Sequence, residues 1–193
     1  MPDSNWQQQA ISTLDGYYRM IVASTSQLSD DQLFQKPKPG FNSVANLLRH
    51  LGGNLRSRWT DFLTTDGEKP DRNRDSEFED WDGDRESLIA FFNDGWSRFR
   101  QTLESLGERD LQATILIRGE NHSVSQAILR SLTHVAYHVG QINLVARMIH
   151  DDDKTWNWMT IQPGQSKTFN ESTWGTSKSR GIAGQEKASS QLK

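Results

Sequence analysis

The segment from Ser123 to His150 constrains the fold most strongly, because it predicts one long helix without a proline. Ser123 followed by Gln126 forms a capping-box pattern, which satisfies amide groups at the start of a helix. One continuous apolar stripe recurs at helical spacing: Val124, Ile128, Leu132, Val135, Val139, Ile142, Ala146 and Ile149. This stripe predicts that the helix faces a core.

A polar flank of the same helix carries two histidines. His134 and His138 are four residues apart, so their rings lie one turn apart on the same face and can converge on one metal ion. A third ligand must then come from another part of the chain. His122 and His150 fall at the two ends of the helix, and a helix-end role is favoured for His150 because a cation is favourable near a helix C-terminus.

Three further long helices are predicted from periodicity and capping residues. They cover residues 3–27, 43–65 and 84–106. Asp3 or Ser4 can cap the first, Ser43 caps the second, and Gly107 is a natural C-cap of the third. Between the first two, a short turn is predicted from Ser29.

The second helix has a polar flank of its own. His50 lies at the edge of its apolar stripe, and Asn54 lies on the same side one turn later. The pair Gly52 and Gly53 is unusual here, because each glycine inside a helix costs roughly 1 kcal/mol relative to alanine. Close approach of a neighbouring helix or of a ligand would explain the pair.

Two connections have distinct compositions. Residues 66–83 are charged and aperiodic, and we expect a solvated loop with internal salt bridges. Its acids have calcium-loop-like spacing, but Ser76 stands where a turn glycine is needed and Asp82 where a glutamate is needed, so a calcium site is not expected. Later, Thr114–Ile117 has strand character and residues 119–121 can turn the chain, which predicts a short hairpin.

At 193 residues, the chain is long enough for one domain with extensions. Residues 1–150 would form that domain. The apolar fraction of 34% and the mean hydropathy of −0.77 are low, which indicates that part of the length is not packed. We expect residues 151–175 to form an irregular arm on the bundle or on a partner subunit, and residues 176–193 to be disordered.

The charge pattern and composition limit the classes of binding partner and of metal ligand that we expect. The net charge of −3, with dispersed basic residues, gives no reason to expect nucleic acid or an anionic membrane as a partner. No run of residues approaches membrane-spanning length and the first residues lack a signal-peptide pattern, so a cytoplasmic location is the expectation. Without cysteine, a metal could be held only by His, Asp or Glu.

His50, His134 and His138 form the candidate metal site. Neutral imidazoles suit Zn, Ni, Fe or Cu, and three protein ligands leave open positions for water or substrate. Histidines beside an apolar stripe can equally be hydrogen-bonded core residues. Val135 stands where a zinc protease of the HExxH type needs its glutamate, so proteolysis is not expected. Serine-hydrolase and nucleotide-binding motifs are also missing from the sequence.

The segments SVANLLRHL and LTHVAYHVGQI resemble the DinB/YfiT-like four-helix superfamily, and the resemblance extends over about residues 5–150. It implies an all-α, up-down-down-up four-helix bundle that is often a homodimer. It also implies a divalent metal held by three histidines, which correspond here to His50, His134 and His138. Characterised members of the superfamily include metal-dependent transferases that use thiols such as bacillithiol or mycothiol, and hydrolase-like proteins.

These observations predict a divalent-metal-dependent enzyme, with Zn or Ni as the metal and a small-molecule substrate. Transfer of a bacillithiol-like thiol is favoured over hydrolysis on the resemblance alone. Asn54, Gln141 and Tyr137 could orient ligands or substrate, and each could equally be an ordinary polar or interface residue. The metal should dissociate as the histidines protonate, around or below their ordinary pKa of about 6.5. The alternative is a non-catalytic dimeric bundle with a structural metal or with structural histidines.

Overall fold

The computed structural model describes residues 6–150, 152 and 155–174. The elements in chain order are α1 (Trp6–Thr25), α2 (Asp30–Phe34), α3 (Val44–Trp59), the 3-10 helix η1 (Asp75–Phe78), α4 (Arg85–Ser105), the 3-10 helix η2 (Glu108–Gln112), β1 (Thr114–Ile117), β2 (Glu120–Ser123), α5 (Val124–Ile149) and α6 (Ser166–Trp174). The predicted all-α class is confirmed, with one small hairpin before α5.

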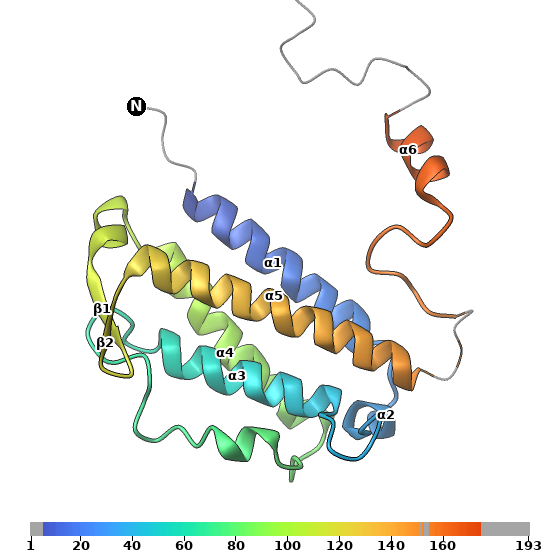
Figure 1. The fold of residues 1–193 in the computed structure, drawn as a ribbon, viewed down its shortest axis with the longest axis horizontal. Helices are drawn as coiled ribbons and strands as arrows, with labels where there is room; N and C mark the ends of the chain where they lie inside the picture. The colour runs from blue at the N-terminus through green and yellow to red at the C-terminus, as the bar shows by residue number, and fades with distance from the viewer. Residues whose placement is uncertain (1–5, 151, 153–154, 175–193) are drawn as a thin grey trace, which may run out of the picture. The chain divides into compact units, whose positions relative to one another are not determined.

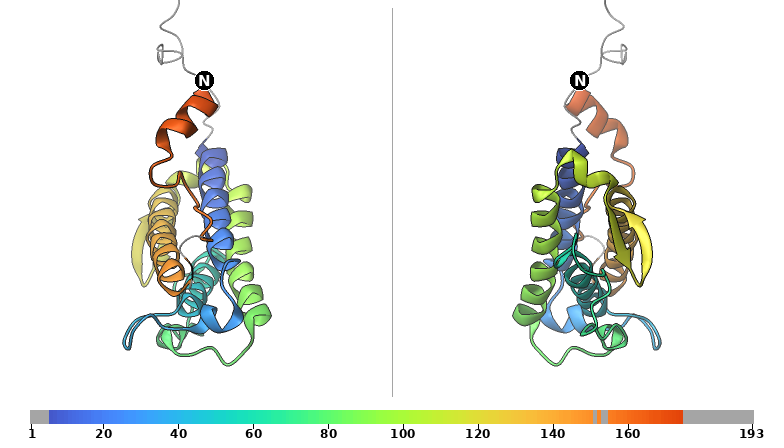
Figure 2. Two further views of the ribbon diagram at one scale, coloured as in Figure 1. Left: turned by 90° about the vertical axis from the view of Figure 1, so that its right-hand side faces the viewer. Right: turned by 90° about the vertical axis from the view of Figure 1, so that its left-hand side faces the viewer.

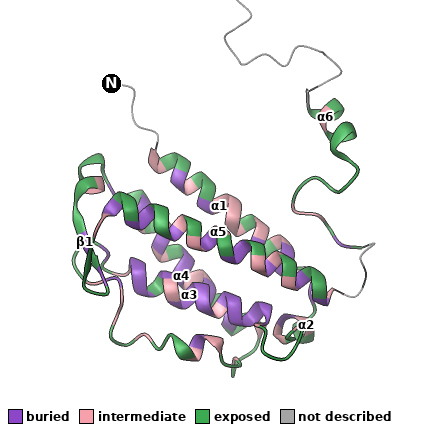
Figure 3. Ribbon diagram, in the orientation of Figure 1, coloured by how far each residue is buried: buried purple, intermediate pink, exposed green. Residues whose placement is uncertain are grey.

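Helices α1, α3, α4 and α5 form a four-helix bundle (Figure 1). Seen along the bundle in Figure 2, α4 and α5 lie on opposite sides, and α1 and α3 each contact both of them. Buried and exposed residues alternate along α1, α4 and α5, and α3 is buried along most of its length (Figure 3). Helix α1 runs one way, α3 and α4 run the other way, and α5 returns in the direction of α1. This is the predicted up-down-down-up topology.

The parallel direction of α3 and α4 requires a long return connection between them. Residues 60–84 run back along α3, from its C-terminal end to its N-terminal end. Near the C-terminal end, the Ser57 hydroxyl donates to the Gly67 carbonyl at 2.9 Å. At the N-terminal end, the Asn46 side-chain amide donates to the Glu79 carbonyl at 2.7 Å. The connection is therefore attached to α3 at both ends.

The helix starts follow the sequence closely, because capping is a local interaction. Ser43 and Asn46 form a capping box on α3, and Ser123 and Gln126 form the predicted one on α5. Ser29 likewise caps α2, where only a turn was predicted. The predicted caps of α1, at residues 3–4, lie outside the described residues.

One predicted helix end and one predicted helix cap were wrong. Helix α3 ends at Trp59 rather than near residue 65, because the chain turns at Asp61, whose φ of 47° is left-handed. Helix α4 ends in an extended residue, Leu106, and not in a glycine cap. Gly107 has a φ of −97° and starts η2 instead. The glycine is therefore not used for a left-handed helix end.

The glycine pair of α3 marks a close crossing with α4, one of the two explanations predicted. A Cβ atom on Gly52 would lie 3.0 Å from the Phe92 Cα and from the Phe91 ring. From the other side, a Cβ atom on Gly95 would lie within clashing distance of the Gly52 carbonyl oxygen. The two backbones therefore touch, which only residues without a side chain allow.

Gly95→Ala should lower the free energy of unfolding by about 1–3 kcal/mol, because α3 and α4 would have to separate. Gly140→Ala is the matched control, since a Cβ atom at this helical glycine of α5 meets nothing within 4 Å. The control should leave stability unchanged or raise it by up to about 1 kcal/mol. Urea denaturation of both variants measures the difference, and equal stabilities would contradict the close crossing.

Strands β1 and β2 form the predicted hairpin, with Thr114 paired to Ser123 and Ile117 to Glu120. Its turn consists of Arg118 and Gly119, one residue earlier than predicted, and both have left-handed φ angles of 56° and 75°. The return connection joins this hairpin through the Gly67 amide, which donates to the Leu116 carbonyl at 2.8 Å. The hairpin and the connection therefore form one wall beside α3 and α5.

The described residues up to Asn157 form one compact unit, and those from Trp158 onward form another. Trp156 is buried in the first unit, where its ring contacts that of His150, the C-cap of α5. In the second unit, α6 corrects the prediction of a wholly irregular arm over residues 151–175. The predicted tail at 176–193 lies outside the described residues. No helix in the described part of the chain is long and apolar enough to cross a membrane.

Candidate metal centre

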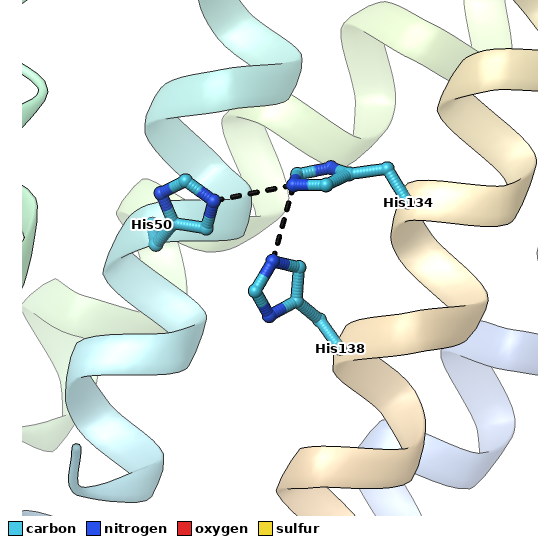
Figure 4. Close-up of side chains that lie close together, drawn as sticks. All are labelled: His50, His134 and His138. Carbon is cyan, nitrogen blue, oxygen red and sulfur yellow. Dashed lines mark hydrogen bonds between the residues drawn. The ribbon is translucent and has the colours of Figure 1, made fainter. Parts of the chain in front are cut away.

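Three imidazole rings converge between α3 and α5 (Figure 4). His50 comes from the middle of α3, and His134 and His138 come from successive turns of α5. The His134 Nε2 atom lies 3.2 Å from the Nε2 atom of His50 and 3.1 Å from that of His138. The structure thus brings together the three histidines of the candidate metal site.

The donor set fits a transition-metal ion. One ligand atom from each ring can be chosen so that all lie within 4.8 Å of one another. Zinc binds imidazole nitrogen at about 2.0–2.1 Å in a tetrahedron, which places two such nitrogens about 3.3 Å apart. The observed separations of 3.1 Å and 3.2 Å are close to that value. Because a neutral imidazole offers only one donor, three Nε2 atoms facing one point are better satisfied by a cation than by one another.

Glu77 orients the His50 ring. The His50 Nδ1 atom lies 2.8 Å from the Glu77 Oε2 atom, and both side chains are only 5% exposed. A carboxylate accepts hydrogen bonds, so Nδ1 carries the proton and the lone pair of Nε2 points toward the other two histidines. Carboxylates commonly fix metal-binding histidines in this way. Glu77 was not predicted from the sequence.

Arg72 holds Glu77 in place from the same connection. Its Nε atom donates to Glu77 Oε1 at 2.8 Å and its Nη2 atom to Oε2 at 2.9 Å, and the Arg72 side chain is 4% exposed. Burial alone would raise the pKa of Glu77, but the hydrogen bonds from His50 and Arg72 outweigh burial and lower it. Glu77 is therefore a carboxylate at neutral pH.

The return connection has the salt bridges predicted for residues 66–83 but differs from the predicted solvated loop in its burial. Its internal salt bridges are present, as Arg72 also lies 3.4 Å from Glu68. It is not simply solvated, because the Glu77 side chain is buried and packs against α3 at Gly53. Gly53 makes the room, since a Cβ atom there would overlap the Glu77 carboxylate. Gly52 thus allows the close approach of α4, and Gly53 makes room for the Glu77 side chain.

The two histidines of α5 remain neutral well below neutral pH. Burial, and then the charges of the other two histidines, lower the pKa of His134 to about 3. Burial and the neighbouring His50 lower the pKa of His138 to about 4, against an opposing interaction with Gln141. Both rings therefore keep a lone pair for a metal across the physiological range. The low pKa values also move the expected onset of proton competition below the ordinary histidine value near 6.5.

The stability of the metal-free protein should fall as the pH is lowered from about 6.5 to about 4. In this window, the unfolded chain protonates His134 and His138, whereas the folded chain keeps them neutral. The unfolded state then binds more protons, so acid favours unfolding. Thermal denaturation of the metal-free protein from pH 7 to pH 4 tests this. His138→Gln should show a shallower dependence, and an equal slope in the wild type and this variant would contradict it.

The other predicted site residues lie around the histidines in different ways. Asn54 and Tyr137 line a cavity of about 420 Å³ that also borders His50 and His134. Tyr137 is 64% exposed and its ring contacts that of His138. Gln141 does not line the cavity and lies on the His138 side, as its effect on the pKa of His138 indicates.

The remaining two histidines stay apart from this group. His122 lies in β2, paired with Ile115, and His150 ends α5. Three of the five histidines therefore form one cluster, and the other two lie outside it, near the two ends of α5.

Comparison with known proteins supports the fold. The chain matches a family of proteins of unknown function, DUF1572, over residues 3–165. No curated protein sequence matches it. Among solved structures, it is similar to YfiT from Bacillus subtilis, with a TM-score of 0.61 and 17% sequence identity. The match covers 76% of this chain and 89% of YfiT, which is reported as a probable metal-dependent hydrolase with an unusual four-helix bundle topology.

At this level of identity, the likeness to YfiT concerns the fold. It agrees with the bundle described above, in which two parallel neighbours, α3 and α4, are joined by a long return connection. The family match spans the whole bundle and its three histidines. The chain therefore belongs to the DUF1572 family, which is a DinB-like family.

Proposed function

We propose that this chain is a divalent-metal-dependent enzyme whose metal, Zn or Ni, is held by His50, His134 and His138. The observation that carries the proposal is the number of ligands. Structural zinc sites are almost always closed by four protein ligands, whereas catalytic sites keep an open position. Among the described residues, the histidine group has three members, and two of them border a cavity.

Residues of this chain would fix the orientation and spacing of the metal-binding histidines before a substrate binds. Glu77 fixes the ring of His50, and the separation of α3 from α5 fixes the distance between the rings. A bound divalent metal would supply Lewis acidity, which makes water or a thiol more acidic and polarises a substrate. Asn54 and Tyr137 offer polar groups on the cavity wall, within reach of a small molecule beside the metal.

Thiol transfer is the reaction we favour. A low-molecular-weight thiol would release its proton to solvent, its sulfur would form a bond to an electrophilic carbon, and the leaving group would depart from that carbon with the bonding electrons. The superfamily resemblance supports this choice. Hydrolysis is the second candidate, and the description of YfiT as a probable metal-dependent hydrolase favours it. Both reactions use the same open position.

The function can be tested with protein loaded with Zn or Ni. A panel of small thiols would be offered with 1-chloro-2,4-dinitrobenzene, whose chloride is displaced, and p-nitrophenyl esters would test hydrolysis. His138→Ala should abolish turnover while the protein stays folded, and His150→Ala, a histidine outside the cluster, should not. Turnover that is equal in both variants would contradict a catalytic site. A large fall in melting temperature of His138→Ala, without turnover in the wild type, would support the non-catalytic bundle with a structural metal.

The same helix offers a surface for the homodimer that we also propose. Tyr137, Leu144 and Met148 follow one another along α5 at helical spacing and are between 54% and 64% exposed. Exposed apolar rows of this kind mark interaction surfaces. Light scattering should give twice the chain mass for the wild type and the chain mass for Leu144→Asp, whereas a monomeric wild type would contradict the dimer.

A further inference from the structure

The cavity beside the histidines is lined by arginines from every wall. Arg58 comes from α3, Arg72 and Arg74 from the return connection, Arg118 from the hairpin turn, and Arg130 from α5. The other lining residues are His50, Asn54, Ile117, Ser131, Thr133, His134 and Tyr137. No aspartate or glutamate is among these described lining residues. The fold thus gathers arginines that are dispersed in the sequence.

Two of these arginines already form ion pairs with glutamates that do not line the cavity. Arg72 is occupied by Glu77, as described above. Arg58 is 9% exposed, and its Nη1 atom lies 3.0 Å from Glu68 Oε2, in an ion pair without hydrogen-bond geometry. Glu68 also lies 3.3 Å from the Nε atom of Arg118. Within the described residues, the positive charges at the cavity therefore exceed the negative charges that contact them.

The other three arginines present unused N–H groups. Arg118 uses only its Nε atom toward Glu68, and its side chain is 54% exposed. Arg74 stacks on the Phe78 ring at 5.2 Å and forms no ion pair in the described part of the chain. The Arg130 side chain, which lines the cavity, has neither a hydrogen bond nor an ion pair with the described residues. Guanidinium groups match the oxygens of a carboxylate or phosphate in a planar, two-pronged geometry.

The backbone at Arg118 shows how this side chain is positioned. The φ of 56° is left-handed, a conformation that costs backbone energy for most residues and that two-residue hairpins usually give to Asn or Gly. The Asp66 carboxylate stabilises this turn by accepting the amides of Arg118 at 2.8 Å and Gly119 at 2.7 Å. The hairpin therefore holds an arginine where asparagine would be less strained, with its guanidinium at the cavity.

We propose that the cavity binds a small-molecule substrate by a phosphate or carboxylate group, held by Arg74, Arg118 and Arg130. This rests on the proposed function, because it names the substrate class of the same site. The volume of about 420 Å³ suits a small molecule. An oxyanion on the arginines would place the remainder of the molecule against His134 and His50, which border the same cavity. Ser131 adds a neutral hydroxyl group to the cavity wall, whereas the Thr133 hydroxyl already donates to the Leu129 carbonyl.

Binding to the metal-free protein tests the inference independently of catalysis. Isothermal titration calorimetry would use inorganic phosphate and succinate as probes, with glycerol as an uncharged control. The wild type should bind at least one of the two anions, and Arg130→Gln should bind it at least about tenfold more weakly, the loss expected for one charged hydrogen bond. Arg19→Gln is the matched control, since this exposed arginine of α1 does not line the cavity.

Arg118→Asn separates recognition from folding. Asparagine tolerates the left-handed turn, so the melting temperature should not fall, while anion binding should weaken at least about tenfold. Stronger binding of phosphate would assign a phosphate group to the substrate, and stronger binding of succinate would assign a carboxylate. The inference is overturned if the wild type binds neither anion, or if Arg19→Gln weakens binding as much as Arg130→Gln. Anion binding without turnover by the metal-loaded protein would overturn the proposed enzyme instead.

Discussion

The purified wild-type protein should contain about one equivalent of a transition metal per chain, and His134→Ala should contain none. His134 is the central ligand, because its Nε2 atom lies within 3.2 Å of both other Nε2 atoms. Without it, two nitrogens on different helices remain and the open site loses a third of its donors. Elemental analysis of tag-free protein measures the difference.

His122→Ala is the control for this measurement, because His122 lies outside the cluster and its loss should leave the metal content unchanged. Circular dichroism would establish that both variants are folded. Wild-type protein that stays free of metal after incubation with Zn and Ni would remove the chemical basis of the proposed enzyme. The bundle with structural histidines would then be the better interpretation.

Glu77→Gln should weaken metal binding by about 10–100-fold, the effect usual for the partner of a metal-binding histidine. It should also lower the free energy of unfolding by about 3–5 kcal/mol, since an amide cannot balance the buried charge of Arg72. Glu77 accepts hydrogen bonds from His50 and Arg72 with both of its oxygens. An amide offers only one acceptor oxygen, so one of these donors is left facing an NH₂ group.

Glu79→Gln is the matched control, because Glu79 follows two residues later and its side chain is exposed. It should change neither the metal affinity nor the stability by a measurable amount. Competition with a chromogenic chelator gives the affinity, and urea denaturation gives the stability. Equal metal affinities for the two variants would show that Glu77 does not orient His50.

Much of the scaffold could be predicted from the sequence because its signals are local. The Ser123 capping box and the apolar stripe depend on residues within a few turns, and both lead to α5. The spacing of His134 and His138 placed two ligands on one face. Predicting His50 as the third ligand required more information, because no local pattern indicates that α3 packs beside α5. The polar flank of α3 and the superfamily resemblance supplied it.

The rest of the site depends on contacts between distant segments. Glu77 lies in a segment without periodicity, and its partner His50 is 27 residues away. The one available signal was the glycine pair in α3, which indicated that something approaches closely, but not what. The arginines of the cavity are dispersed in the sequence, and that order gives no sign that the fold brings them together. Helix α6 was missed because nine residues carry little periodic signal.

The return connection between α3 and α4 has a consequence for how such a protein can diversify. The three histidines stand on helices of the bundle, whereas Arg72, Arg74 and Arg118 stand on the return connection and the hairpin turn. Exchanging the other residues of these two segments would leave the three histidines in place, provided that Glu77 and its partner Arg72 are kept. A library that varies only residues 73–76 and 117–120 would therefore change the cavity wall while leaving the three histidines, Glu77 and Arg72 in place, because loops on a rigid scaffold tolerate replacement.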